Sequence, residues 1–141
     1  MCLLWGYVES NKEDGEPRKF DVNAVADRYG QWYNSDPFDI GRTTENALEV
    51  FKSQGKTAAD AVIAANMKNA SSKSNGSTMR CMPHAIFLAN LVKAEKYKEV
   101  YDVVAIESNL VHGQKMVYEA NFVYIVALSH ILNNPTASDR G

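Results

Sequence analysis

Residues 21–33 of the chain read DVNAVADRYGQWY, and this stretch sets the expected fold. Its apolar side chains recur at the spacing of one helical face, at Val22, Val25, Ala26, Tyr29, Trp32 and Tyr33. Asp21 stands directly before them, where its carboxylate can accept hydrogen bonds from the first free N–H groups of a helix. The stretch therefore predicts an amphipathic helix that begins after Asp21.

Helical spacing continues on the C-terminal side of this stretch. A compact turn, NSDPFDIGRTT, follows it, after which Thr43 or Thr44 is expected to cap a helix that ends at Gly55. Thr57 with Asp60 resembles an acidic form of the capping box, so a further helix is expected to begin there. The side chains expected to face inward from these two helices are Ala47, Leu48, Phe51, Ala58, Ala61, Val62 and Ala65.

Four more helical segments are predicted around this centre. Pro83 suits the first turn of a helix, and a second helical period runs from Tyr97 to Gly113. A last helix precedes Asn133-Asn134-Pro135, and the opening MCLLWGYV reads as the later part of a longer helix. The residues expected inward after Pro83 are Ile86, Phe87, Leu91 and Ala94. No segment alternates as a strand does, so we expect an all-α protein with roughly six helices in a single domain over residues 1–141.

The composition of the chain limits the kinds of partner that it is expected to bind. A formal net charge of −2 gives no electrostatic field that would attract nucleic acid, so no nucleic-acid partner is expected. Cys2 and Cys81 are the only cysteines, without zinc-ligand spacing, which favours an intracellular, cytoplasmic setting over a disulfide framework. The apolar opening is too short to span a bilayer, so no membrane partner is expected.

The stretch SSKSNGSTMR, residues 71–80, interrupts the helical rhythm with small polar residues. Such a run suits either an exposed turn or a loop whose backbone N–H groups cradle an anion. The soft residues Met79, Cys81 and Met82 indicate that the loop lies against the core, where Arg80 needs an anionic partner. That partner is either a bound phosphate or an internal carboxylate such as Asp39, and the sequence leaves both open.

The other candidate residues carry weaker signals. Asp36 and Asp39 could be metal ligands, but beside Pro and Gly they are more often structural. His112, directly before Gly113, is either a cap at a helix C-terminus or a ligand contact. The remaining candidates are interpreted as structural: Cys81 as a buried thiol, His84 and His130 as surface or boundary residues, and Trp32 and Tyr33 as packing rather than base-stacking side chains.

Three segments together resemble the ADP-ribosylglycohydrolase family in order and spacing. They are RYGQWYNSDPFDIGRTTENAL at 28–48, SNGSTMRCMP at 74–83 and SNLVHG at 108–113. The resemblance implies a compact orthogonal helix bundle, incomplete at both ends, because the chain corresponds to only the central part of the family's domain. It also implies that Asn75, Gly76 and Ser77 touch ADP-ribose, with Met79 and Arg80 shaping the loop around it. His112 matches a Thr-His site near the diphosphate and ribose, although Val111 stands where Thr is usual.

The same resemblance bears on catalysis. The family cleaves a glycosidic bond between ADP-ribose and a protein side chain with a pair of magnesium ions, held by Thr-Asp-Asp-Thr or Thr-Asp-Asp-Ser and Asp-x-Asp-Thr motifs that this sequence lacks. We therefore expect no magnesium site and no hydrolysis by this chain alone. Two functions follow as hypotheses: an ADP-ribose-binding piece of an ADP-ribosylglycohydrolase, or a non-catalytic structural subunit, as some relatives are. Under either hypothesis another protein chain is expected to cover the incomplete faces.

Overall fold

Helices make up all the regular structure in residues 2–9, 19–52 and 55–134, the parts that the computed structural model describes. Eight α-helices and one 3-10 helix occur there, without a strand, which confirms the all-α prediction. In order they are α1 (Cys2–Glu9), α2 (Val22–Asn34), α3 (Arg42–Leu48), the 3-10 helix η1 (Glu49–Lys52), α4 (Ala58–Asn69), α5 (Pro83–Phe87), α6 (Ala89–Lys93), α7 (Tyr97–Asn109) and α8 (Lys115–Asn133).

Three predicted helix starts are confirmed. Asp21 accepts a hydrogen bond of 2.8 Å from the backbone N of Asn23 and so caps α2. Thr57 and Asp60 form the capping box of α4, with the Thr57 backbone N 2.7 Å from Asp60 Oδ2. Pro83 occupies the first turn of α5, where its missing N–H leaves no intrahelical bond unmade.

The start of α3 differs from the prediction. Gly41, rather than Thr43 or Thr44, is the N-cap residue, and it supplies no side-chain bond. The Thr43 hydroxyl instead lies 3.0 Å from Ser72 Oγ, across the chain in the polar loop. The prediction of a threonine cap was wrong because this hydroxyl is used to tie α3 to the loop.

The helix expected after Pro83 is divided in two. Leu88, with φ −98° and ψ 3°, separates α5 from α6, so a single helical period does not extend through the segment. Ile86, predicted to be buried, is 60% exposed, whereas His84, predicted at the surface or boundary, is fully buried. Both predictions were wrong because α5 is too short and too abruptly turned for its sequence period to identify the inner face.

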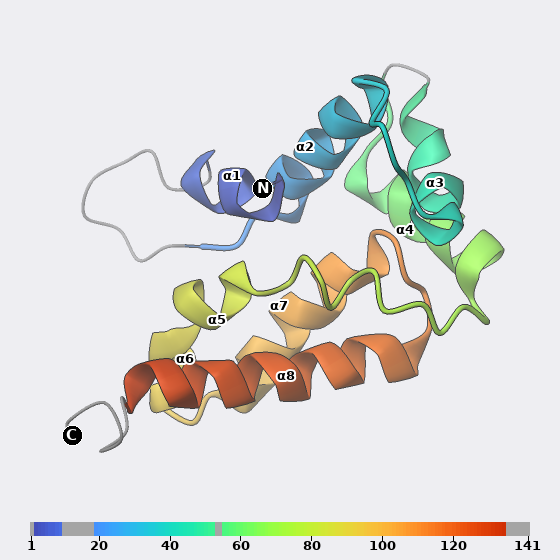
Figure 1. Cartoon of the computed structure of the whole chain (residues 1–141). Helices are drawn as coiled ribbons and strands as arrows, with labels where there is room; N and C mark the ends of the chain where they lie inside the picture. Colours follow the sequence, from blue (N-terminus) through green and yellow to red (C-terminus); the bar gives the residue numbers. More distant parts are fainter. Residues whose placement is uncertain (1, 10–18, 53–54, 135–141) are drawn as a thin grey trace.

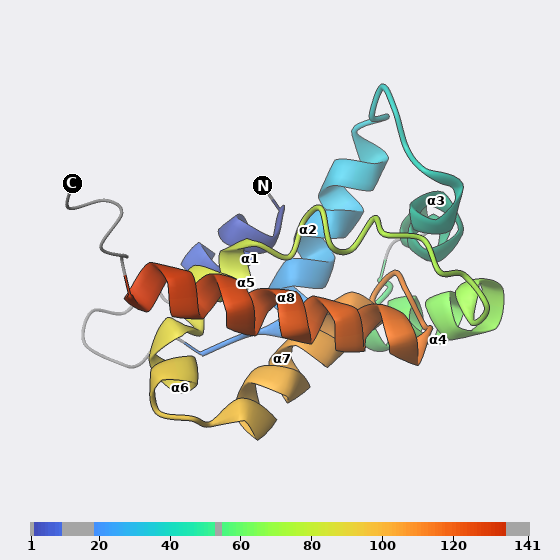
Figure 2. The ribbon, with the colours of Figure 1, turned by 60° about the horizontal axis from the view of Figure 1, so that its bottom comes forward.

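The helices form two layers, which meet along the loop between α4 and α5. Helices α1, α2, α3 and α4 make the first layer, and α5, α6, α7 and α8 make the second (Figure 1). Each layer has its own apolar core, and Leu110 and Val111, just after α7, join the core of the first layer. Residues 70–82 run between the layers, with α8 on the outer side of the second layer (Figure 2). The fold thus places the predicted ligand loop at the boundary between two cores.

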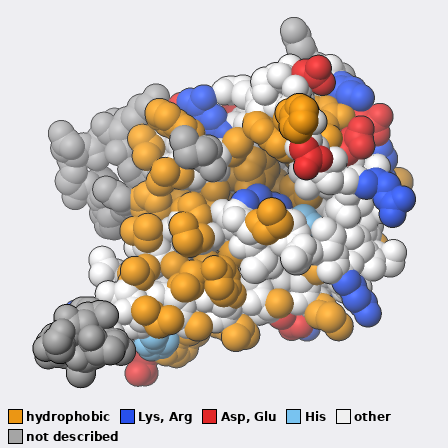
Figure 3. All heavy atoms as spheres, in the orientation of Figure 1, with side chains coloured by type: hydrophobic (Ala, Val, Ile, Leu, Met, Phe, Trp, Pro, Cys, Tyr) orange, Lys and Arg blue, Asp and Glu red, His pale blue; other side chains and the backbone are white. Residues whose placement is uncertain are grey.

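Several large apolar side chains remain at the surface. Figure 3 shows hydrophobic side chains gathered over α1, α5 and α8 on one face of the molecule. The exposed members on these helices include Trp5, Ile86, Met116, Val123 and Ile131. Among the described residues, no helix combines the length and apolarity needed to cross a membrane. The assignment of the chain to a single partial domain stays a prediction.

Candidate functional site

A cavity of about 430 Å³ lies at the boundary between the two layers. Three of the six residues that the sequence predicts to bind a ligand line it: Gly76, Met79 and Arg80. The rest of the lining comes from Cys2, Leu3, Tyr29, Trp32, Thr44, Leu48 and Val111. The loop, the ends of α1 and α7, and one face of α2 therefore converge on this space, although they lie far apart in the sequence.

The bend in the loop is a pair of tight turns. The backbone N of Thr78 donates to the Asn75 carbonyl at 3.0 Å, and the N–H groups of Arg80 and Cys81 both donate to the Ser77 carbonyl at 3.1 Å. Because these bonds use backbone groups of the loop itself, the bend has a defined shape without a ligand. Asn75 is exposed and does not line the cavity.

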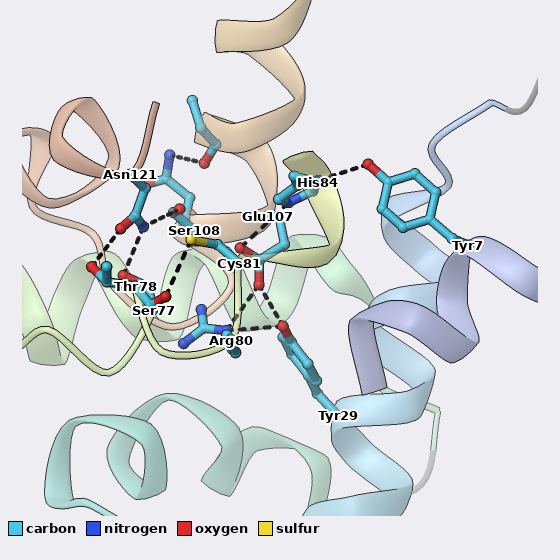
Figure 4. A network of polar contacts seen from close by, with 12 residues as sticks. Tyr7, Tyr29, Ser77, Thr78, Arg80, Cys81, His84, Glu107, Ser108 and Asn121 are labelled. Carbon is cyan, nitrogen blue, oxygen red and sulfur yellow. Dashed lines mark hydrogen bonds and ion pairs between the residues drawn. The ribbon is translucent and has the colours of Figure 1, made fainter. Parts of the chain in front are cut away.

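Asn121 of α8 holds this bend from beneath. Its Nδ2 donates to Ser77 Oγ at 2.8 Å and to Ser108 Oγ of α7 at 2.9 Å. Its Oδ1 accepts a hydrogen bond of 2.7 Å from the Thr78 hydroxyl (Figure 4). Ser77 is fully buried by this arrangement, so its side chain supports the bend rather than facing the cavity.

Arg80 is tied to two residues of different helices. Its Nε lies 2.9 Å from Glu107 Oε1 of α7 and 2.9 Å from the Tyr29 hydroxyl of α2, and that hydroxyl also donates to Glu107. The guanidinium carbon lies 5.3 Å from the centre of the Tyr29 ring, a cation–π distance. Arg80 thus has the internal carboxylate partner that the sequence left open, but that partner is Glu107, and Asp39 is exposed.

The charges of this pair are fixed by their surroundings. Burial alone would raise the pKa of Glu107, but the positive charge of Arg80 and the hydrogen bond from Tyr29 lower it to about 2. Burial raises the pKa of the Tyr29 hydroxyl well above its usual value, so this hydroxyl keeps its proton. An ionised carboxylate therefore holds a cationic guanidinium at the wall of the cavity.

The polar contacts continue from Glu107 into the second layer. His84 Nε2 lies 3.8 Å from Glu107 Oε2, too far for a hydrogen bond. The other ring nitrogen of His84 shares a hydrogen bond of 2.6 Å with the hydroxyl of Tyr7 in α1. Figure 4 shows that Tyr7, His84, Glu107 and Arg80 follow one another from α1 to the loop.

His112 lies beneath the loop, just after the end of α7. It is fully buried, and neither ring nitrogen has a hydrogen-bond partner among the described residues. Burial and the nearby charge of Arg80 lower its pKa to about 4, so the ring is neutral at pH 7. A Cβ added to Gly76 would lie 3.5 Å from the His112 ring, which places the predicted loop glycine directly over this histidine.

Two residues that bond Arg80 escaped the functional reading of the sequence: Glu107, which lies behind the cavity, and Tyr29, which lines it. Glu107 occupies an inward position of the α7 period, in register with Val100, Val104 and Val111, and a charge at such a position signals a buried partner. Tyr29 was expected only to pack in the core. By contrast, Cys81 is fully buried, as predicted, and burial raises its thiol pKa to about 12.

In the part of the chain that the structure describes, no group of side chains is placed to hold the magnesium that the family resemblance implies. Within residues 2–9, 19–52 and 55–134, no group of three or more His, Cys, Asp or Glu side chains is placed to hold a metal ion. Asp36 and Asp39 are both exposed, and Asp36 adopts a left-handed backbone conformation with φ 54°, typical of a turn. The interpretation of these two carboxylates as structural stays a prediction.

Comparisons with known proteins show the family of the chain. The family model for ADP-ribosylglycohydrolase matches residues 1–140. Over 121 residues, 85% of this chain, the sequence is 31% identical to an Acanthamoeba polyphaga mimivirus protein named "Putative ADP-ribosyl glycohydrolase". That alignment spans 35% of the length of the mimivirus protein. No solved structure matches the chain. The extent of the family match, over nearly every residue, shows that the chain belongs to the ADP-ribosylglycohydrolase family.

Proposed function

We propose that the chain binds ADP-ribose, free or attached to a protein, in the cavity that the loop of residues 70–82 forms with the helices of the first layer. The observation that carries this proposal is the convergence of Gly76, Met79 and Arg80 on one cavity, with His112 directly beneath Gly76. These residues are distant in sequence from Tyr29 and Trp32 of α2, which also line the cavity, and Tyr29 contacts Arg80 directly. The lining by three of the six residues that the resemblance associates with the ligand supports the proposal.

The chemistry of the cavity suits such a ligand. Trp32 offers aromatic surface against which an adenine can pack, and Arg80 supplies a positive charge for a diphosphate. A volume of about 430 Å³ lies within the usual range of small-molecule sites. His112 is fully buried and does not line the cavity, so its contribution is to pack beneath Gly76 and support the loop.

We propose further that binding by this chain does not depend on magnesium and that the chain alone does not hydrolyse the glycosidic bond. Two metal ions need several converging carboxylates, and the described residues contain no such group. Addition of Mg²⁺ is expected to leave the affinity unchanged and to produce no free ADP-ribose from an ADP-ribosylated peptide. Release of ADP-ribose that requires Mg²⁺ would overturn this part of the proposal.

The binding proposal is tested by titrating the chain with ADP-ribose and following binding by calorimetry. Met79 lines the cavity and is 80% exposed, so Met79→Glu adds a negative charge at the cavity without disturbing the core. We expect this variant to lose affinity by about tenfold, because the new carboxylate repels the diphosphate. Met82→Glu is the matched control, since Met82 is also exposed but does not line the cavity. Absence of binding by the unchanged chain, or equal losses in both variants, would contradict the proposal.

The second candidate function is that of a non-catalytic subunit docked to another protein chain. The observation that favours it is a stripe on the outer face of α8, where Met116, Val123 and Ile131 are each more than half exposed and Ala120 and Ala127 lie between them. This spacing suits an amphipathic helix of a partner, because small residues permit close helix packing. Val123→Lys is expected to abolish self-association or capture of such a partner, as measured by sedimentation. Association that Val123→Lys leaves unaffected would exclude α8 as the docking face and so contradict the candidate.

A further inference from the structure

We propose that Glu107 is a positioning residue for ligand binding, which fixes the direction in which Arg80 presents its guanidinium to the cavity. This inference rests on the proposed binding of a diphosphate in that cavity. Glu107 does not line the cavity and cannot touch the ligand directly. Its effect would be exerted through its bond to Arg80, which does line the cavity.

The geometry of the bond is the first argument. Glu107 Oε1 and the Tyr29 hydroxyl both lie 2.9 Å from the same nitrogen of Arg80, Nε. Two acceptors at Nε fix the plane of the guanidinium and leave its terminal nitrogens for other partners. Figure 4 shows these terminal nitrogens pointing away from Glu107 and Tyr29, on the side of the loop residue Ser77.

Unsatisfied bonding capacity is the second argument. Arg80 Nη2 is buried and has no hydrogen-bond partner among the described residues. A buried cationic donor without a partner is costly in a finished core but is expected next to a site that receives an anion. The Arg80 side chain is long and flexible. Its Nη2 donor therefore keeps one position only if other contacts hold the rest of the guanidinium.

The third argument is that the charge of Glu107 opposes anion binding. Its ionised carboxylate partly neutralises Arg80, so on electrostatic grounds alone its removal would strengthen the affinity for a diphosphate. If Glu107 serves to position Arg80, its removal weakens that affinity instead. The two roles therefore predict changes of opposite sign.

The experiment compares Glu107→Gln with Glu107→Met. Glutamine keeps an oxygen that can accept from Nε, whereas methionine has a similar length but offers no such acceptor. We expect Glu107→Met to weaken ADP-ribose binding by about tenfold, the loss typical of one misplaced charge-assisted hydrogen bond, and Glu107→Gln to stay within about threefold of the unchanged chain. NMR titration measures both dissociation constants, with adenosine titrated in parallel as a ligand that lacks phosphate.

The adenosine titration separates positioning from a merely structural role. A positioning role leaves adenosine affinity within about twofold in Glu107→Met, because no phosphate contacts Arg80 in that complex. Equal losses for both ligands would show that the cavity has collapsed, and an unchanged or higher affinity for ADP-ribose would show that Arg80 needs no support. Either result overturns the inference.

Substitutions at two tyrosines complete the experiment, one as a second test and the other as a control. Tyr29→Phe removes the second acceptor at Nε, so it is expected to weaken the binding of ADP-ribose but not the binding of adenosine. This variant tests the positioning role if Glu107→Met does not fold. Tyr7→Phe removes a buried hydroxyl that bonds His84 rather than Arg80, so it is expected to leave both affinities unchanged. An unchanged chain that binds no ADP-ribose refutes the proposed function itself. Normal binding with no selective loss in the Glu107→Met and Tyr29→Phe variants refutes only the positioning role.

Discussion

The His112 ring is a buried base that is kept neutral at some cost in acid stability. Its pKa lies at about 4 in the folded chain, below the usual histidine value of about 6.5. The unfolded chain therefore binds more protons between these values, and the free energy of unfolding falls as the pH is lowered from about 6.5 to about 4. We expect His112→Asn to flatten this part of the pH profile in urea denaturation.

A matched substitution shows whether the effect is specific to burial. His130 is exposed on α8, and His130→Asn is expected to leave the pH profile as it is in the unchanged chain. If both variants retain the same fall between pH 6.5 and 4, His112 is not the group responsible, and its ring must reach solvent or a partner in solution.

Single residues also show what the sequence could and could not predict at the site. The loop around Gly76 was identified from small polar residues, because turn chemistry is local and depends only on neighbours in the chain. The partner of Arg80 could not be chosen, since Glu107 and Asp39 were both available and the choice depends on how α7 lies against α2. The charge of Glu107 at an inward position of its helix was the signal that could have decided between them.

At the scale of elements, helix starts were more predictable than helix faces. Asp21 and the Thr57–Asp60 box act on N–H groups within one turn, so their sequence alone predicted them. The inner face of α5 was predicted wrongly because five residues are too few to define a period. Tertiary packing, which places His84 between Tyr7 and Glu107, determines that face instead.

The capping box of α4 supports one prediction at this scale. Thr57→Ala removes the hydroxyl that accepts from the backbone N of Asp60, and we expect a loss of about 1 kcal/mol in the free energy of unfolding. Urea denaturation followed by circular dichroism measures this loss. Ala59→Ser is the control, because Ala59 is exposed in the first turn of the same helix. A loss in the control as large as that in Thr57→Ala would mean that the box does not stabilise α4.

The link between the loop and α8 supports another prediction. Asn121→Leu would remove three hydrogen bonds and leave the hydroxyls of Ser77 and Ser108 without their donor. We expect a loss of about 2–4 kcal/mol in the free energy of unfolding and faster hydrogen exchange at the amides of Thr78 and Arg80. Ser129→Ala in the same helix removes a single bond, to the Ala85 carbonyl, and should leave exchange in the loop unchanged. Equal exchange in both variants would show that the loop keeps its shape without Asn121.

For the molecule as a whole, the boundary that holds the cavity also joins the two layers. Tyr29 bonds Glu107 across it, and the rings of Tyr7 and Phe87 stack there at 4.1 Å. Because polar and apolar contacts both cross the boundary, the layers are expected to unfold together. The chain's two tryptophans lie in α1 and α2, so their fluorescence reports the first layer, whereas circular dichroism reports every helix.

We therefore expect the fluorescence and circular dichroism transitions of the unchanged chain to coincide in urea. Glu107→Met leaves Arg80 as an uncompensated buried charge at the boundary, which costs about 3 kcal/mol or more and should separate the two transitions. Lys98→Gln, which removes an exposed ion pair with Asp102 within α7, should leave the two transitions coincident.

Two separate midpoints in the unchanged chain would mean that the layers unfold independently. The loop that lines the cavity is bonded to Glu107 and Asn121 of the second layer, so it would then move relative to the first-layer helices that form the rest of the lining, and a ligand bound there would stabilise the association of the layers rather than fill a preformed site.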